Sequence, residues 1–434
     1  MLLIFPKAEV AARRCFALSV LFAGVTALNV AFAQSYDNPT LGQNPVVAHP
    51  QDYKPLGVRA GAFMLHPGVE LAAEWHDNIL YTQDNTISDT IFHVRPYITA
   101  QSTWSRHSLS VRLAADVARY ADYGFRDYED YFFQVGGHLD ISSQSVFSYG
   151  LDYLELHEER NVRSADQGIE PTTYSLTGGT LGYDHTFNRL SLGLGYILRD
   201  LQYDNSIDEF GNVIDNSDRD RRDQVFDVRL GYQMQTDKQL FVQAGFNDVE
   251  YDQRYDRNGF DRSSSGWFAS AGIDFMLTGV LSGDAYVTFR ERSYNDELLQ
   301  DVSGWGFGAG LTWMPTTLTT LRGTVSTSIE DTTQSTASGY FRTMYALRAD
   351  HELLRDLQIH AQLAYYVNDY ELLPDAPPDA REEDKLWRVG VGATWFINRW
   401  AWISASYDFS DFTTNFPNDD YQANIAWLVL GFER

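Results

Sequence analysis

The chain of 434 residues contains a single cysteine, Cys15. This residue lies in an N-terminal segment that we expect to be removed, so the mature protein would hold no cysteine. Arg13 and Arg14 stand directly before Cys15, which is not the setting of a lipoprotein acceptor cysteine. We therefore exclude disulfide bonds, thiolate metal sites and a cysteine nucleophile from the mature chain.

Long apolar runs are also absent after Gln34. A transmembrane helix needs about 20 consecutive, mostly apolar residues, and no stretch of the mature chain comes near that length. If the protein lies in a membrane, it must cross it as strands. Those strands must close into a barrel, because lipid cannot satisfy the hydrogen-bonding groups of an open sheet edge.

Basic residues are scarce: 33 Lys and Arg stand against 59 Asp and Glu, and the net charge is -26. This balance argues against nucleic-acid binding, which requires a basic face. The acidic residues cluster mainly in segments 204–223, 369–384 and 408–420. We interpret these segments as solvated loops between strands, and the alternative is that they bridge divalent cations to an anionic surface glycolipid.

The N-terminus has the pattern of a secretory signal peptide. Lys7, Arg13 and Arg14 form a basic region, residues 15–30 are apolar, and Ala31 and Ala33 frame a small-residue cleavage site. A membrane-spanning anchor is the alternative, but the apolar run is short for one. We thus divide the chain into a signal peptide (1–33), a polar periplasmic leader (34–67) and an outer-membrane β-barrel (68–434).

The dominant pattern of the mature chain is an alternation of apolar residues with polar or small ones, as in Ser264–Leu277. Period-two alternation is typical of half-buried β-strands. Its recurrence predicts an all-β fold, a transmembrane antiparallel up-and-down β-barrel of about 18 strands with its apolar side toward lipid. The expected strands are 68–80, 90–103, 108–121, 129–142, 146–157, 173–186, 189–203, 223–235, 239–252, 264–277, 281–293, 301–314, 318–330, 338–351, 356–369, 384–397, 400–410 and 420–432.

The expected connections alternate strictly between eight short turns and nine long loops, such as 158–172 and 204–222. An even barrel with both ends on one side has one turn fewer than loops, and outer-membrane barrels carry short periplasmic turns and longer extracellular loops. A soluble β-sandwich or propeller is the alternative. Sandwich strands are shorter, however, and the sequence shows no propeller repeat of about 40–50 residues.

The phase of the alternation separates a lipid face from an inner face. In strand 281–293, Ala285, Val287 and Phe289 face lipid, so the residues between them face inward. The inward charges form either a network that holds the wall together or a selectivity ladder for a charged or hydroxylated solute. The lumen-lining candidates are Arg112, Asp116, Asp227, Arg229, Asp284, Tyr286, Arg290, Arg292, Arg322, Arg342, Arg348, Asp350 and Arg388.

Strand 301–314 carries four alternating glycines, which are Gly304, Gly306, Gly308 and Gly310. They are not a nucleotide-binding loop, because the G-x-G-x-x-G spacing fails and no helix follows. They predict a bare strip on the inner face. This strip either accommodates large neighbours such as Tyr286 or leaves a smooth path for a chain-like solute.

No catalytic motif stands out in the sequence. It contains neither G-x-S-x-G nor H-E-x-x-H, and His157-Glu158-Glu159 lacks the second histidine of the latter. We therefore expect no catalytic residues, no bound metal, no cofactor and no enzymatic activity.

The first quarter of the mature chain carries a set of short motifs. They are Tyr53-x-Pro55-Leu56-Gly57-Val58-Arg59-Ala60-Gly61-Ala62-Phe63, then Pro67, Asp77-Asn78-Ile79, Trp104-Ser105-Arg106-His107 and Tyr128-Glu129-Asp130. This segment resembles the second family of outer-membrane β-barrel porins of proteobacteria. The resemblance implies a wide, eighteen-stranded barrel without catalytic residues, and exopolysaccharide secretion is associated with some members. One departure is that Phe432 is followed by Glu433 and Arg434, whereas outer-membrane barrels usually end on an aromatic residue.

These features predict an outer-membrane, porin-like channel for passive translocation of hydrophilic solutes or for export of a surface polysaccharide. A structural or adhesive surface barrel that acts through its loops is the alternative. We expect contacts with outer-membrane lipid, lipopolysaccharide and the barrel-insertion machinery. Periplasmic polysaccharide export components are further partners if the cargo is a polysaccharide, and no nucleic-acid partner is expected. Both termini should lie in the periplasm after cleavage near Ala33.

Overall fold

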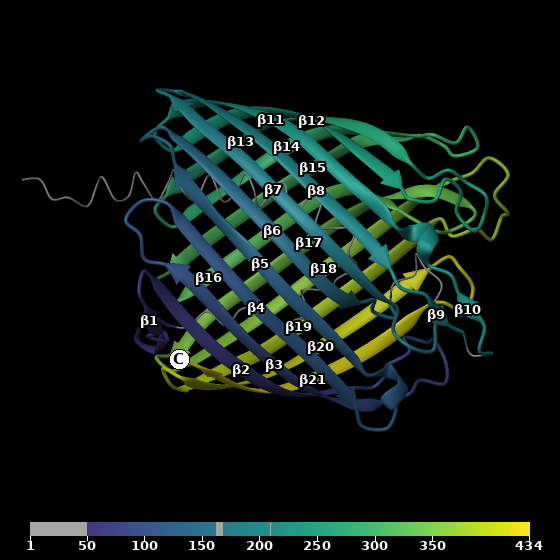
Figure 1. Cartoon of the computed structure of the whole chain (residues 1–434), viewed down its shortest axis with the longest axis horizontal. Coiled ribbons are helices and arrows are strands. Elements are labelled where there is room, and N and C mark those ends of the chain that lie inside the picture. The colour runs from purple at the N-terminus through teal and green to yellow at the C-terminus, as the bar shows by residue number, and fades with distance from the viewer. Residues whose placement is uncertain (1–49, 162–167, 209) are drawn as a thin grey trace, which may run out of the picture.

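The computed structural model describes residues 50–161, 168–208 and 210–434. The expected signal peptide and most of the expected leader lie outside these residues. The wall is a closed barrel of 18 antiparallel strands (Figure 1). Its first and last strands, β2 (Phe63–His76) and β21 (Tyr421–Glu433), pair from Gly68↔Glu433 to His76↔Ile425 and close the barrel. This architecture confirms the predicted fold class.

The remaining wall strands follow one another along the chain and around the barrel. They are β3 (Asp89–Ser102), β4 (Ser108–Tyr120), β5 (Tyr128–Asp140), β6 (Ser145–His157), β7 (Thr173–Phe187), β8 (Leu190–Tyr203), β11 (Arg221–Gln235), β12 (Lys238–Tyr251), β13 (Ser264–Thr278), β14 (Leu281–Tyr294), β15 (Val302–Thr316), β16 (Thr319–Asp331), β17 (Ala337–Leu354), β18 (Leu357–Leu372), β19 (Glu383–Asn398) and β20 (Ala401–Thr414).

Small elements lie outside the wall. β1 (Val58–Ala60) pairs with the start of β2, and β9 (Ser206–Ile207) pairs with β10 (Val213–Ile214) inside a long loop. Within residues 50–161, 168–208 and 210–434, the helices are three 3₁₀ turns, η1 (Gln51–Tyr53), η2 (Gly124–Arg126) and η3 (Ser217–Arg219). None of the helices in the described residues is both long and apolar enough to cross a membrane.

The first wall strand begins at Phe63, five residues before its expected start at residue 68. Pro67 lacks the N–H group that a sheet ladder uses, so in the sequence it indicates the boundary of a strand. In the structure Pro67 lies opposite the C-terminal Arg434, whose N–H donates to the Pro67 carbonyl at 3.0 Å. The missing donor is harmless there because the ladder with β21 ends at this level. Residues 58–66, expected to belong to the leader, are therefore largely part of the sheet.

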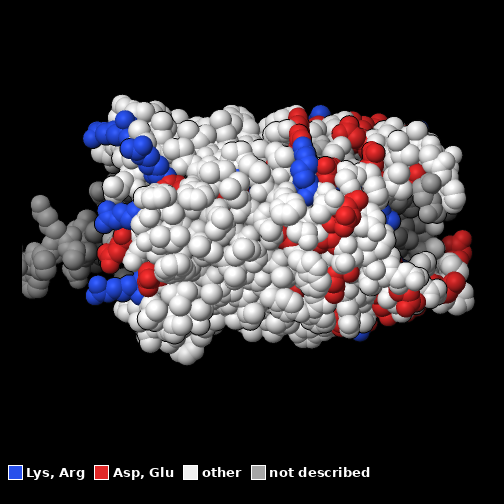
Figure 2. Space-filling view, turned by 90° about the horizontal axis from the view of Figure 1, so that it is seen from below, with Lys and Arg blue, Asp and Glu red and all other residues white. Residues whose placement is uncertain are grey.

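The outer surface is apolar between two charged ends. Figure 2 shows a broad belt without Lys, Arg, Asp or Glu on the face in view, with charges gathered at the short-turn end and at the long-loop end. Exposed side chains of the wall include Trp267, Phe307 and Val391, and Trp305 is 74% exposed. The apolar phase of the strands thus forms the surface that a barrel presents to lipid.

Candidate functional site

The interior of the barrel is the candidate site, and the thirteen predicted lumen-lining residues lie on strands of its wall. In β14, for example, Val287 is exposed at the outer surface, whereas Asp284, Tyr286 and Arg290 occupy the opposite phase. The strand registers assign the others to the same phase, and exposed side chains such as Leu113, Leu230 and Leu347 mark the opposite phase. The others are Arg112, Asp116, Asp227, Arg229, Arg292, Arg322, Arg342, Arg348, Asp350 and Arg388.

Several of these residues form ion pairs across neighbouring strands. Arg229 donates to Asp274 at 2.8 and 2.9 Å. Asp350 pairs with two arginines, Arg322 at 2.7 Å and Arg348 at 2.8 Å. These pairs stabilise the wall because each inward charge has a partner of opposite sign at hydrogen-bond distance.

Other inward residues have polar or aromatic partners. Asp116 accepts from Arg95 at 2.8 Å, Asp227 accepts from Gln243 at 2.9 Å and Arg342 donates to Asn368 at 2.9 Å. The guanidinium of Arg290 lies 5.5 Å from the centre of the Phe268 ring.

Arg112 and Arg388 differ from the rest. Among the described residues, neither forms a hydrogen bond or an ion pair, and their guanidinium groups lie 5.3 and 5.9 Å from the rings of Tyr97 and Tyr366. The predicted residues therefore do not assemble into one site. They form separate groups along the inner wall, some paired and some not.

The ladder between β15 and β16 covers only part of the wall. It runs from Thr316↔Thr319 to Ala309↔Val325, although β15 extends back to Val302 and β16 extends on to Asp331. Beyond this point a side chain replaces the backbone partner, because the Thr327 hydroxyl accepts from Phe307 N at 3.2 Å and lies 3.3 Å from Phe307 O. The two strands separate toward the long-loop end.

Past this separation, β16 runs inside the wall. Oδ1 of Asp331 lies 2.6 Å from Nη1 of Arg292 in β14. Residues 329–331 line a small cavity together with inward side chains of β8, β11 and β12, among them Ile197, Val225 and Val249. In the wall, β8 is six strands away from β16, or roughly 29 Å at about 4.8 Å per strand. The end of β16 can reach β8 only across the interior, and we call residues 326–342 the infolded hairpin.

The glycine strip of β15 lies beneath these side chains. A Cβ at Gly306 would be 2.0 Å from Thr327 Oγ1, and a Cβ at Gly304 would be 3.2 Å from the ring of Phe341. A Cβ at Gly308 would be 2.2 Å from the ring of Tyr286, and one at Gly310 would be 2.9 Å from Oδ1 of Asp284. The strip is covered along its length by side chains of β14, β16 and β17.

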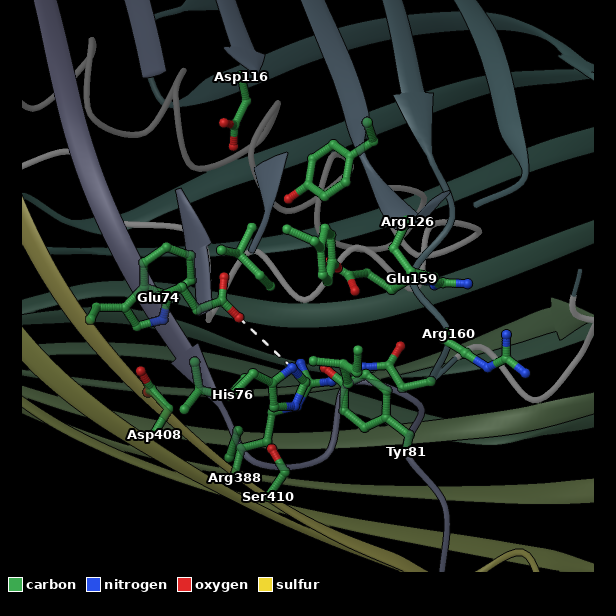
Figure 3. A pocket seen from close by; sticks show the side chains of 18 of the residues that line it. Glu74, His76, Tyr81, Asp116, Arg126, Glu159, Arg160, Arg388, Asp408 and Ser410 are labelled. Atoms are coloured by element: carbon green, nitrogen blue, oxygen red, sulfur yellow. Dashed lines mark ion pairs between the residues drawn. The ribbon is translucent and has the colours of Figure 1, made fainter. Parts of the chain in front are cut away.

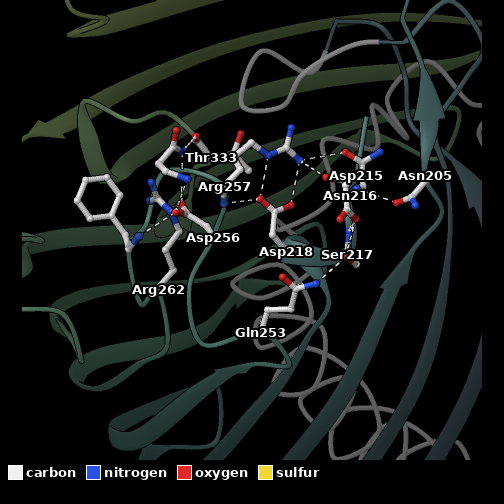
Figure 4. A network of polar contacts seen from close by, with 12 residues as sticks. Asn205, Asp215, Asn216, Ser217, Asp218, Gln253, Asp256, Arg257, Arg262 and Thr333 are labelled. Atoms are coloured by element: carbon white, nitrogen blue, oxygen red, sulfur yellow. Dashed lines mark hydrogen bonds and ion pairs between the residues drawn. The ribbon is translucent and has the colours of Figure 1, made fainter. Parts of the chain in front are cut away.

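A buried arginine of the β12–β13 loop holds the tip of the infolded hairpin (Figure 4). Arg262 is 4% exposed. Its guanidinium donates to the carbonyl of Gln334 at 2.9 Å and to those of Ala337 and Ser338 at 3.3 and 3.4 Å. Its Nε donates to Asp256 at 2.6 Å, which fixes the guanidinium in its own loop. One side chain therefore satisfies three backbone carbonyls of the hairpin.

The same loop is linked to the β8–β11 loop (Figure 4). Arg257 donates to the two carboxylate oxygens of Asp218 at 2.8 and 2.9 Å and to the carbonyl of Asp215 at 2.7 Å. Asn258 donates to the Thr333 carbonyl of the hairpin at 3.1 Å. The β8–β11, β12–β13 and β16–β17 loops thus form one polar network at the long-loop end of the barrel.

A second cavity lies between the inner faces of β2–β5 and β18–β21 (Figure 3). Its volume is about 100 Å³, and it is partly open to solvent. Beside it, the buried His93 ring lies 3.0 Å from Asp116 and 3.3 Å from Glu74. Arg95 donates to Asp116 at 2.8 Å and lies 5.1 Å from the centre of the Trp427 ring. This network orders one side of the cavity.

A family model described as "Putative beta-barrel porin 2" matches residues 49–434 of this chain. The chain belongs to this family of β-barrel porins. It is accordingly an outer-membrane porin, and the family resemblance of the sequence motifs is confirmed. A comparison with curated proteins finds no match.

Solved structures similar to this porin include three bacterial barrels. OccK3 (OpdO) of Pseudomonas aeruginosa is 13% identical, with a TM-score of 0.42, 85% of this chain and 95% of that chain covered. OccK2 (OpdF) of the same organism, in complex with glucuronate, is 12% identical, with a TM-score of 0.45 and coverage of 86% and 97%. A BenF-like porin from Pseudomonas fluorescens Pf-5 is 10% identical, with a TM-score of 0.45 and coverage of 85% and 99%.

Two carboxylates in the long loops of the porin are held ionised by basic neighbours. Burial alone would raise the pKa of Asp218, but the hydrogen bonds and charge of Arg257 outweigh it and lower that pKa below its usual value of 3.8. Burial likewise opposes ionisation of Glu159, and the adjacent His157 imidazole, 3.6 Å away, lowers the pKa of this carboxyl. Both carboxylates are therefore ionised as members of ion pairs near the long-loop end.

Three important residues of the porin interior have no place in the sequence prediction. Asp331 follows the expected strand 318–330 and was predicted as the first residue of a long loop, whereas it ends β16, in the outward phase of that strand. Arg262 lies in a loop, where no periodicity operates. His76 is inward by phase, but one histidine among many inward polar residues gives no further signal. For Asp331, the only available clue is a carboxylate in a phase that is otherwise apolar or small.

Proposed function

We propose that this porin conducts small hydrophilic solutes through a channel that the infolded hairpin narrows. An eighteen-stranded barrel is wide enough to leave an aqueous channel. The observation that carries the proposal is the ion pair and backbone hydrogen bonds that hold residues 326–342 inside the wall. A segment fixed inside a barrel limits the width of the remaining path and thereby the size of the solute.

The same observation favours small solutes over a polymer. A polysaccharide chain would need a continuous wide path, and the glycine strip that offered one is covered by Thr327, Phe341 and Tyr286. Export of a polymer through this barrel would require the hairpin to leave its contacts with Arg262 and Arg292. Paired charges such as Arg229 and Asp274 act on the solute by hydrogen bonding rather than by net charge.

We also propose an orientation and a set of partners. The C-terminus lies at the short-turn end (Figure 1), which supports a periplasmic position for the short turns and both termini after cleavage near Ala33. The long loops then face the outside, where their charges would contact lipopolysaccharide. The barrel-insertion machinery would act on β21, and periplasmic export components would dock at the short-turn end if the cargo were a polysaccharide.

We propose transport without catalysis.

The mature protein in planar lipid bilayers tests the channel. We expect discrete conductance steps for the native chain. A shortened hairpin, in which an Asn-Gly turn replaces residues 328–342 so that Thr327 joins Thr343 through a two-residue loop, should give larger steps. The matched control is Arg254→Gln, since this side chain is 77% exposed in the same loop as Arg262. A barrel that stays sealed with and without the hairpin would contradict the proposal and favour a structural or adhesive surface barrel.

A further inference from the structure

The cavity between β2–β5 and β18–β21 contains polar groups that lack a partner. His76 and Arg126 are each 4% exposed, and His76 Nε2 and Arg126 Nε form no hydrogen bond with any described residue. Arg388 has neither a hydrogen bond nor an ion pair in the described part of the chain. All three side chains line the same cavity (Figure 3). Buried polar groups without partners are rare in native structures, so a cavity that gathers them is suited to a polar ligand.

The other charges of this cavity are already engaged. Asp116 is held by Arg95 and His93, and Glu74 lies beside the His93 and His76 rings at 3.3 and 3.8 Å. Asp408 accepts from Gln362 at 3.1 Å. Glu159 also lines the cavity, 3.6 Å from the His157 imidazole, and Arg160 there donates to the Gly168 carbonyl at 2.8 Å. Nη1 of Arg126 donates to the Ile169 carbonyl at 3.0 Å. The donors left over are therefore the Arg388 guanidinium and Nε of Arg126. A planar guanidinium matches a carboxylate, which can accept two parallel N–H bonds.

The remaining lining of the cavity suits a hydroxylated molecule. Trp427, Tyr81 and Tyr120 supply flat amphipathic rings, which pack against the C–H face of a ring while leaving its polar edge free. Ser410 and the carboxylates of Glu74 and Asp408 face the same space and can accept from hydroxyl groups. Unpartnered His76 Nε2 can accept from or donate to a hydroxyl. Aromatic surfaces with a few convergent polar groups are the usual composition of a small-molecule site.

We infer that this cavity binds a sugar acid, that is, a small polyhydroxylated ring or chain with one carboxylate, at a stopping point along the channel. Arg388 and Arg126 would hold the carboxylate, and His76, Asp408 and Ser410 would contact the hydroxyl groups. The inference rests on the proposed channel function because the solute reaches the cavity through the barrel interior. It adds to that function a chemical class of solute and a place where the solute pauses.

Isothermal titration of the detergent-solubilised mature porin with sodium glucuronate tests the inference without requiring conduction. We expect saturable binding to the native protein. Arg388→Gln should weaken it on the order of tenfold, because it removes one charge-assisted interaction. His76→Leu should weaken it as well, since it removes a hydroxyl contact. Arg254→Gln is the control and should bind like the native chain. Heat-modifiable migration on gels verifies that each variant is folded.

The ligands compared with glucuronate define the class. Glucose lacks the carboxylate and acetate lacks the hydroxyl groups, so we expect both to bind at least tenfold more weakly. Equal binding of glucose would overturn the role of Arg388, and equal binding of acetate would overturn the sugar part of the assignment. No saturable binding of glucuronate in a barrel that conducts would overturn this inference alone. Binding of glucuronate by a barrel that never conducts would instead contradict the proposed channel and leave the site in place.

Discussion

Asp331 and Arg292 form an ion pair at 2.6 Å between residues that a continuous barrel wall would keep on opposite faces. Arg292 points into the interior from β14. The alternation along β16 assigns Asp331 to the lipid side, together with Val325 and Leu321. The pair exists because the end of β16 leaves the plane of the wall and lies on the inner face of β14 and β15. This ion pair is therefore direct structural evidence that the end of β16 lies inside the wall.

Asp331→Asn removes the charge that draws the hairpin to Arg292. The Arg292 guanidinium, which is largely buried, is left without its carboxylate partner, and we expect the free energy of unfolding to fall by about 1–3 kcal/mol. The hairpin should also move more, so single-channel recordings should show larger and noisier conductance. Asp84→Asn changes an exposed loop carboxylate and is the control. Identical recordings for the two variants would contradict the role of the pair.

Gly306→Val tests whether β15 needs a bare inner face. A Cβ at this position would be 2.0 Å from Thr327 Oγ1 and 3.2 Å from the Thr288 methyl group. We expect overpacking to cost about 1–3 kcal/mol of unfolding free energy and to push the hairpin away from β15, which should raise the conductance. Gly150→Ala is the comparison, since its Cβ would find its nearest neighbour, Thr180 Cβ, at an ordinary 3.7 Å. Equal stability and conductance of the two variants would show that the strip is not a contact surface.

Asp218 makes the loop network sensitive to acid. Its folded-state pKa lies below the usual 3.8 because Arg257 favours the charged form. A lowered pKa means that the contribution of this group to stability is fully present above 3.8 and is lost as the pH falls through the folded-state pKa. We expect the β12–β13 loop to resist an acid-tolerant protease at pH 5 and to become cleavable as the pH drops below 3.8. Asp218→Asn should be cleavable at both values, and protection of this variant at pH 5 would contradict the account.

The wall could be predicted from the sequence because its physical cause is periodic. Alternation between lipid and interior fixes the phase of each strand, and turn lengths fix the strand count, so the eighteen strands and the inward residues of β14 follow directly. The start of β2 was predicted five residues too late, since Pro67 resembles a boundary unless one knows that β21 ends opposite to it. This error in the start of β2 therefore has a local cause, which is a single proline.

The infolded hairpin could not be predicted in the same way. Ile329 and Phe341 keep the apolar outward phase of their strands, so the pattern of β16 and β17 is that of an ordinary lipid-facing hairpin. What moves them inward are contacts between residues far apart in the sequence, such as Arg262 with Gln334 and Asp331 with Arg292. Single-sequence alternation contains no information on such pairs. The four glycines of β15 are a partial exception, because their missing side chains predict either large neighbours or a bare path, and the structure shows large neighbours.

The most direct test of the infolding is a pair of double-cysteine variants in a Cys15→Ser background, where no other cysteine is present. In the structure a Cβ at Gly306 lies 3.0 Å from Thr327 Cβ, so Gly306→Cys with Thr327→Cys should form a disulfide on mild oxidation, after a small adjustment to the usual separation of about 3.5–4.5 Å. In a continuous ladder, extension of the observed register pairs residue 306 with residue 328 on the inner face, while residue 327 points outward. The infolded hairpin predicts efficient cross-linking in the Gly306→Cys, Thr327→Cys variant and little cross-linking in the Gly306→Cys, Ser328→Cys variant. Efficient cross-linking of the second variant and little of the first would contradict the infolding.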